Sequence, residues 1–150
     1  MPVITVETRI RAPRERCFDL ARDVTLHTAS TAQTRERAVG GVTTGLLELG
    51  DAVTWEGTHF GVRQRLTSRI TRYDRPNGFR DSMVRGAFRR FDHDHLFTQV
   101  DGVTTMTDVF DFDSPFGIVG RIADRLLLRK YMDRFLRARA EVLRQAAERL

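Results

Sequence analysis

Hydrophobic and polar residues alternate regularly near the start of the chain and then change period. Residues 3–11 (VITVETRIR) alternate with period two, which predicts a strand. Residues 14–22 carry apolar side chains at helical spacing, and Asp23 is suited to cap a second short helix over 24–32. One strand followed by two short helices departs from the alternation of strands and helices in a doubly wound fold.

The middle of the chain returns to strand-like alternation. After a glycine-bearing segment around 40–50, the pattern predicts strands over 51–60, 62–73, 79–84, 90–100 and 104–113. Turn residues separate these segments, and Asp101-Gly102 is a strong signal for a hairpin. The arginines of 62–73 alternate with apolar residues, so we expect them on the solvent face, because burying an unpaired guanidinium group is costly.

The last pattern has helical spacing and extends from residue 118 to residue 150, after a capping Ser114-Pro115 pair. An antiparallel sheet with one polar face must bury its other face, and this helix is the largest element that could cover it. The sequence therefore predicts an α+β fold. A curved antiparallel sheet of about seven strands wraps around a long C-terminal helix, in a single domain over residues 1–150. Such a sheet leaves a cavity between itself and the helix.

Composition excludes several classes of protein. One cysteine among 150 residues allows no intrachain disulfide, and no apolar run approaches the roughly 20 residues of a membrane helix. We therefore expect a cytoplasmic protein without stable membrane insertion. The net charge of +5 invites a nucleic-acid partner, but residues 61–90 hold nine arginines whereas residues 91–120 hold six aspartates and no basic residue. Neighbouring strands of opposite charge should neutralise each other, so we expect no nucleic-acid partner.

Several segments resemble those of one known family. They are the opening strand followed by APRERCFDLARD, then GDAVTWEGTHFG, RLTSRITRYDRP, GAFRRFDHDHLF, and DSPFG before the terminal helix. Together they resemble the START-related superfamily, also called SRPBCC or Bet v 1-like, and within it the small bacterial members grouped with polyketide cyclases and dehydrases. The resemblance implies the helix-grip fold and a pocket for a hydrophobic or amphipathic small molecule, such as a lipid- or polyketide-like compound. It implies no cofactor.

The alternation of the strands predicts which side chains face the pocket. The predicted ligand-binding residues are Trp55, His59, Gln64, Leu66, Asp81, Met83, Phe91, His93, His95, Phe97, Met106 and Phe110, with Ser68, Asp108 and Phe112 on the same face. Asp81 and Asp108 would be costly on an inward face unless paired, and Arg85 or a pocket histidine is the expected partner. His27 is expected either near the pocket entrance or as an ordinary surface residue.

The His93-Asp94-His95 segment is the sharpest chemical feature. Residues two apart on a strand share a face, so the imidazoles could orient a ligand or act as general acid and base together with Asp108. They could also bind a metal with a third ligand from a neighbouring strand, such as His59, Asp81 or Asp108. A structural or ligand-orienting role is favoured, and we predict no metal.

The sequence supports three hypotheses about the function of the protein. The first is non-catalytic binding of a hydrophobic small molecule in the cavity. The second is a cyclase, dehydratase or hydrolase that uses the pocket histidines as acid and base. The third is a partner-binding or regulatory protein that uses the sheet edge or the terminal helix. The sequence leaves open whether the chain forms a homo-oligomer. The sequence leaves open whether the protein is an enzyme.

Overall fold

The computed structural model describes residues 3–31, 34–113 and 127–149. The strands are β1 (Val3–Ile10), β2 (Arg37–Gly41), β3 (Ala52–His59), β4 (Val62–Asp74), β5 (Gly78–Arg85), β6 (Arg90–Val100) and β7 (Val103–Asp113). The helices are α1 (Arg14–Ala21), α2 (Val24–Ser30) and α4 (Arg129–Glu148). The strands form an antiparallel sheet in the order β1-β7-β6-β5-β4-β3-β2. The predicted helix-grip architecture is confirmed.

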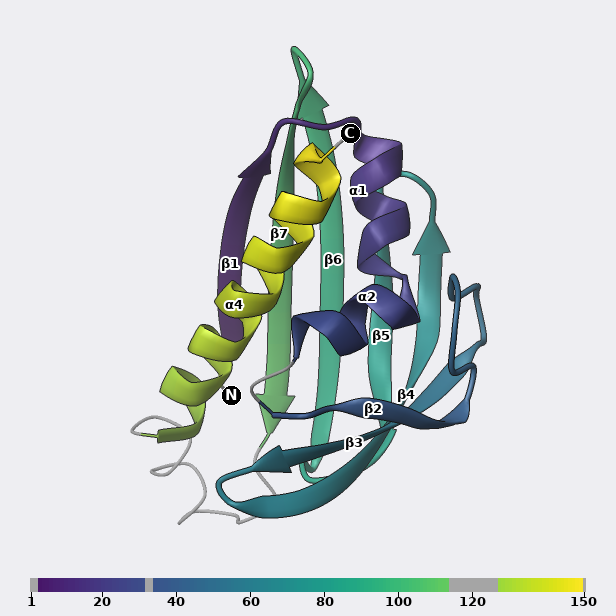
Figure 1. Ribbon diagram of the computed structural model, residues 1–150, viewed down its shortest axis with the longest axis vertical. Coiled ribbons are helices and arrows are strands. Elements are labelled where there is room, and N and C mark those ends of the chain that lie inside the picture. The colour runs from purple at the N-terminus through teal and green to yellow at the C-terminus, as the bar shows by residue number, and fades with distance from the viewer. Residues whose placement is uncertain (1–2, 32–33, 114–126, 150) are drawn as a thin grey trace.

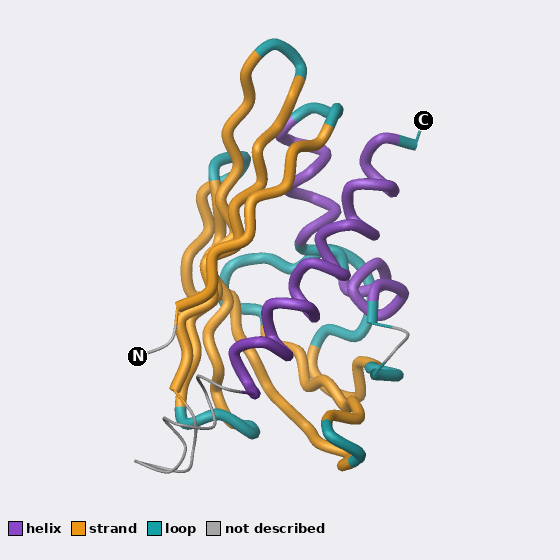
Figure 2. The backbone as a smooth tube through the Cα atoms, turned by 90° about the vertical axis from the view of Figure 1, so that its left-hand side faces the viewer, coloured by secondary structure: helices purple, strands orange, loops and turns teal. Residues whose placement is uncertain are grey.

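Figure 1 shows the three helices in front of the sheet, and Figure 2 shows that they all lie on one side of it. Strands β2 and β3 turn away from the long hairpin of β6 and β7 and pass beneath the helices, so the sheet is strongly curved. The concave side therefore faces α4, as the hydrophobic pattern predicts.

Local sequence explains the turns and caps that set this geometry. Asp101 and Gly102 both adopt positive φ, 51° and 77°, which a two-residue hairpin turn requires between β6 and β7. The Asp23 carboxylate accepts hydrogen bonds from the backbone N–H groups of Thr25 and Leu26, at 2.9 and 3.3 Å, and so caps α2. Both predicted signals are confirmed.

Helix α4 spans 20 residues and buries Met132, Leu136, Ala140, Leu143 and Ala147 on one stripe. The helix predicted from residue 118 is therefore present from Arg129 onward, whereas the expected cap at Ser114-Pro115 and residues 118–126 lie outside the described residues. None of the helices in the described part of the chain combines the length and the apolar composition needed to cross a membrane.

One end of the concave face is solidly packed. Phe18 of α1 is fully buried, and its ring meets Phe79 and Phe97 at centroid distances of 5.3 and 5.6 Å. Ala140 and Leu143 of α4 belong to the same cluster. Helix α1 therefore fills the space between the sheet and the C-terminal half of α4.

The outer face of the sheet carries paired charges. Arg80 of β5 bonds Asp94 of β6 at 2.7 Å, which confirms the expected neutralisation between these two strands. Two arginines of β4 have a different partner, however. Glu56 of β3 accepts hydrogen bonds from Arg63 and Arg65 at 3.2 and 3.0 Å. Strand β3 lies directly beside β4, so its carboxylate is closer to these arginines than the aspartates expected from the sequence.

Candidate functional site

A cavity of about 290 Å³ lies between the sheet and the N-terminal half of α4. Its aromatic lining consists of Trp55, Phe60, Phe88, Phe91, Phe110, Tyr131 and Phe135. Phe60, at the turn between β3 and β4, is 63% exposed, so the cavity reaches the surface there. A space of this size is at the small end of typical ligand pockets, and its wall is mainly apolar with a few polar groups.

The structure places eight of the predicted ligand-binding residues at this cavity: Trp55, His59, Gln64, Leu66, Asp81, Phe91, His93 and Phe110. His95, Met106 and Asp108 instead border a smaller space of about 30 Å³, which His93 also lines. Met83 packs against the aromatic cluster around Phe91, and Phe97 is buried against Phe18 under α1. Met83 and Phe97 face inward as the alternation predicts, but neighbouring side chains fill the space in front of them.

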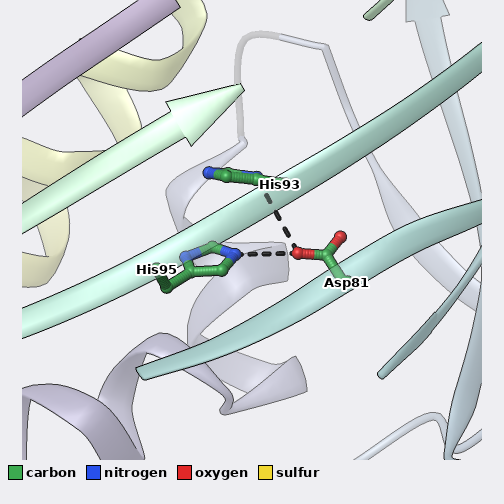
Figure 3. Close-up of side chains that lie close together, drawn as sticks. All are labelled: Asp81, His93 and His95. Carbon is green, nitrogen blue, oxygen red and sulfur yellow. Dashed lines mark hydrogen bonds and ion pairs between the residues drawn. The ribbon is translucent and has the colours of Figure 1, made fainter. Parts of the chain in front are cut away.

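Asp81, His93, His95 and Asp108 form a closed buried cluster on β5, β6 and β7 (Figure 3 shows the first three). His93 Nε2 lies 3.0 Å from Asp108 Oδ1, and His95 Nε2 lies 2.8 Å from Asp81 Oδ1. Asp108 Oδ1 is also 3.2 Å from His95 Nδ1, and Asp81 Oδ1 is 3.8 Å from His93 Nδ1. The imidazole rings stack with centroids 3.8 Å apart. The two pocket histidines, and not Arg85, are therefore the partners that the inward aspartates needed.

Register brings these four side chains together. In the antiparallel pairing, His95 lies opposite Asp108 on β7, and His93 lies opposite Asp81 on β5. Residues directly opposite on one face are close enough for direct contact. His93, His95 and Asp108 are only 4–5% exposed. They need these contacts because an unpaired buried charge is costly.

The pKa values of the two histidines in this cluster are shifted in opposite directions. Burial lowers the pKa of His95, but contacts with Asp108 and Asp81 outweigh burial and raise that pKa to about 9. Burial and the positive charge of neighbouring His95 lower the pKa of His93. Burial also opposes ionisation of both aspartates, yet the histidine contacts hold their pKa values below the usual range. The cluster therefore holds two carboxylates, one imidazolium and one neutral imidazole at neutral pH.

A second polar chain crosses the cavity wall from β3 to α4. Tyr131 Oη lies 2.5 Å from His59 Nδ1, and the other nitrogen of His59 lies 3.8 Å from Glu36 Oε1. Glu36 Oε2 is 3.5 Å from His27 Nε2, and the Glu36 side chain is only 10% exposed. His27 stacks on Trp55 with ring centroids 3.9 Å apart. The Tyr131 hydroxyl and the His59 imidazole are in hydrogen-bond contact and can pass a proton toward or away from a ligand at Tyr131, and Glu36 places a negative charge beside His59.

Gly57 makes room for this chain. A Cβ at residue 57 would lie 2.5 Å from Glu36 Cγ and 3.3 Å from His59 Nε2. A glycine inside a strand often marks such a close approach. Only a residue without a side chain lets Glu36 reach across β3 to the histidines.

Burial and charge also shape the ionisation of this second chain. Burial raises the pKa of Glu36, but contacts with His27 and His59 outweigh it, so the pKa lies well below its usual range. Burial and the nearby Arg139 guanidinium lower the pKa of His27 to about 4. Burial and the charge of Glu36 raise the pKa of Tyr131. At neutral pH Glu36 is therefore an anion facing a neutral His27.

Sequence reasoning missed Glu36, Tyr131 and Arg139, all of which line the cavity. Glu36 lies just before β2, and Tyr131 and Arg139 occur in a helix rich in polar residues, so periodicity gave no signal for them. Gly57 within a strand was the available signal for Glu36. His27 also lines the cavity, so all four histidines of the chain lie at the cavity or directly behind it.

Comparison with known proteins agrees with this architecture. The family described as "Polyketide cyclase / dehydrase and lipid transport" matches residues 1–148. No curated protein is similar enough in sequence to count as a match.

Solved structures of similar fold include an aromatase/cyclase, ZhuI from Streptomyces sp. R1128, with 14% identity, a TM-score of 0.78, and coverage of 99% of this chain and 94% of that chain. A START superfamily protein from Mycobacterium smegmatis has 9% identity and a TM-score of 0.74, with 97% of both chains covered. The ginseng major latex-like protein 151 from Panax ginseng has 14% identity and a TM-score of 0.72, again with 97% of both chains covered. At these identities the structural likeness establishes the fold alone.

The match over nearly the whole chain and the helix-grip architecture agree, and the protein belongs to the family described as polyketide cyclase/dehydrase and lipid transport.

Proposed function

We propose that this protein binds a lipid- or polyketide-like small molecule in the cavity between the sheet and α4, in the cytoplasm. The observation that carries the proposal is the cavity of about 290 Å³, with an aromatic wall and carboxylates and imidazoles at a few positions. Apolar lining supplies the affinity for a hydrophobic body, and the few polar groups orient it.

The polar groups favour particular ligand chemistry. Glu36 and Asp81 supply carboxylates at the wall and Asp108 a third behind it, whereas the cations are the Arg139 guanidinium and one imidazolium. The guanidinium of Arg65, which also lines the cavity, is bonded to Glu56. A ligand that presents hydrogen-bond donors, such as hydroxyl groups, satisfies these acceptors, whereas an added carboxylate would be repelled. The preferred ligand therefore has a hydrophobic or aromatic body with hydroxyl substituents.

A pair of matched substitutions tests the cavity. Leu66 lines the cavity, whereas Leu96 is 44% exposed. We expect Leu66→Trp to occupy part of the space and to weaken binding of prodan, a neutral naphthalene dye, by at least about tenfold. Leu96→Trp adds the same side chain outside the cavity and should leave prodan binding unchanged.

Fluorescence titration with prodan, followed by native mass spectrometry with fatty acids and polyhydroxylated aromatic compounds, gives the readout. Equal loss of prodan binding in both variants would point to a nonspecific surface site. Absence of binding by the unmodified protein to the dye and to every compound of the panel would overturn the proposal.

A second function, acid-base catalysis of a cyclisation or dehydration, is favoured by the Tyr131–His59–Glu36 chain. The sequence analysis assigned this role to His93 and His95, but of that pair only His93 borders the large cavity. With a poly-β-ketone substrate, Tyr131→Phe and His59→Gln should each lower kcat about 10²-fold or more, as removal of a proton-transfer group does. Prodan affinity should change little in Tyr131→Phe. Turnover that is insensitive to both substitutions would leave the protein a binder.

A further inference from the structure

Asp81, His93 and His95 direct one potential ligand atom each toward a common point. Asp81 Oδ1 lies 2.8 Å from His95 Nε2 and 3.8 Å from His93 Nδ1, and the three atoms all lie within 4.8 Å of one another. Atoms that share a metal ion at about 2.1 Å are separated by at most about 4.2 Å. The three atoms are therefore near the separations that one shared ion requires, and a turn of the His93 ring would bring all three onto it (Figure 3).

Asp108 holds the opposite nitrogens of both rings. Its Oδ1 atom lies 3.0 Å from His93 Nε2 and 3.2 Å from His95 Nδ1. A carboxylate that accepts an N–H from each ring directs the other nitrogen of each ring, His93 Nδ1 and His95 Nε2, toward Asp81. Histidines that bind metals are usually held by a carboxylate in this way, which fixes both the tautomer and the ring orientation.

The carboxylates favour a cation at this point. A metal ion would take the place of the proton shared by His95 Nε2 and Asp81 Oδ1, which lie 2.8 Å apart. Bonded to all three atoms, it would neutralise the charges of Asp81 and Asp108.

We propose that Asp81, His93 and His95 bind a divalent first-row transition metal ion, with Asp108 holding the two histidines from behind. Two imidazoles and one carboxylate are typical ligands of Zn²⁺ and Fe²⁺, and unlike those of Mg²⁺ or Ca²⁺, which prefer oxygen atoms. Asp81 and His93 line the large cavity, so the remaining coordination positions face it and are open to water or to an oxygen atom of a ligand.

The sequence analysis named Asp81 among the candidate third ligands of this histidine pair but predicted no metal, because such a pair is a short and common pattern. The observed contacts change that interpretation, since they bring Asp81 to the pair and show that Asp108 orients both rings. The rings are now stacked at an interplanar angle of 29°. A metal in the plane of both rings requires a wider angle, and His93 has the cavity beside it to turn into.

Titration of the full-length, tag-free, EDTA-treated protein with CoCl₂ tests the proposal. We expect one Co²⁺ per chain by calorimetry, with visible d–d absorption bands. Substitutions Asp81→Asn, His93→Gln and His95→Gln should each weaken Co²⁺ binding at least about tenfold, and Asp108→Asn should weaken it about 10- to 100-fold. Asp94→Asn, a matched change on the outer face of β6, should leave the affinity unchanged.

A second measurement covers the case in which a buried variant fails to fold. Long-range ¹H–¹⁵N spectra of the imidazoles in the unmodified protein should show two of the four histidine signals shifting on addition of ZnCl₂. His27→Gln and His59→Gln identify the two signals that should not shift. Unshifted His93 and His95 signals, or Co²⁺ binding that is unaffected by the three ligand substitutions, would overturn the proposal.

This inference is independent of the proposed ligand binding. Prodan binding is measured on EDTA-treated protein, so loss of the metal proposal leaves the cavity proposal intact, and the reverse also holds.

Discussion

The two ends of the concave face differ in how they are filled. Under α1, the ring of Phe18 packs edge to face against Phe79 and Tyr73, and Phe18 is fully buried. Beside the N-terminal half of α4, aromatic rings such as Phe88 and Phe110 surround open space. The same sheet and the same helix α4 contribute to both ends.

Helix α1 accounts for the difference. It places a large side chain between the sheet and α4, whereas α2, farther along, places His27 there and leaves a cavity. The polar clusters follow the same division, since Glu36, Asp81 and His93 all lie at the hollow end. The filled end therefore stabilises the fold, and the hollow end is available for chemistry.

The largest expected effect is the difference in unfolding free energy between substitutions at the two ends. Phe18→Ala removes a fully buried ring from close packing and should lower the free energy of unfolding by about 3–5 kcal/mol. Phe88→Ala removes a ring that borders existing open space, so we expect only about 1–2 kcal/mol. Urea unfolding of both variants checks the comparison. A cost for Phe88→Ala as large as that for Phe18→Ala would contradict it.

The next effect is a pH dependence that arises at the hollow end. The pKa of His27 is about 4 in the folded protein and about 6.5 when unfolded, so the unfolded chain binds more protons between these values. His27 contacts Glu36 and Trp55 and experiences the charges of Arg139 and Asp81. Its contribution to stability is full above pH 6.5 and decreases as the pH falls toward 4.

His27→Gln removes that contribution. Between pH 7 and pH 5, the unfolding free energy of the unmodified protein should fall by about 2 kcal/mol more than that of His27→Gln. Urea unfolding at each pH measures both. Parallel pH profiles for the two proteins would show that His27 is not held neutral by its surroundings.

The smallest expected effect tests whether Gly57 makes room for the Glu36 side chain at the hollow end. Gly57→Ala places a Cβ where Glu36 Cγ now lies and should lower the unfolding free energy by about 1 kcal/mol. It should also displace Glu36 from His59 and His27. A crystal structure of the variant with Glu36 unmoved would disprove this role of Gly57.

Much of the architecture could be predicted from the sequence because it depends on neighbouring residues. Alternation identified the inward faces of β3 to β7, Asp101-Gly102 marked the β6–β7 turn, and Asp23 marked the start of α2. The candidate site was predicted less completely. The inward direction of Phe97 was predicted, but whether it meets open space or Phe18 depends on where α1 packs.

The sequence by itself determined which side chains point inward, because alternation and helical spacing depend only on residues close together along the chain. The tertiary structure decided which of those side chains meet. Glu36, His59 and Tyr131 come from the segment before β2, from β3 and from α4. The contacts of Asp81 and Asp108 with His93 and His95 depend on the register of three strands. Long-range packing brings these groups together, and patterns among residues close together in the chain do not predict which groups meet.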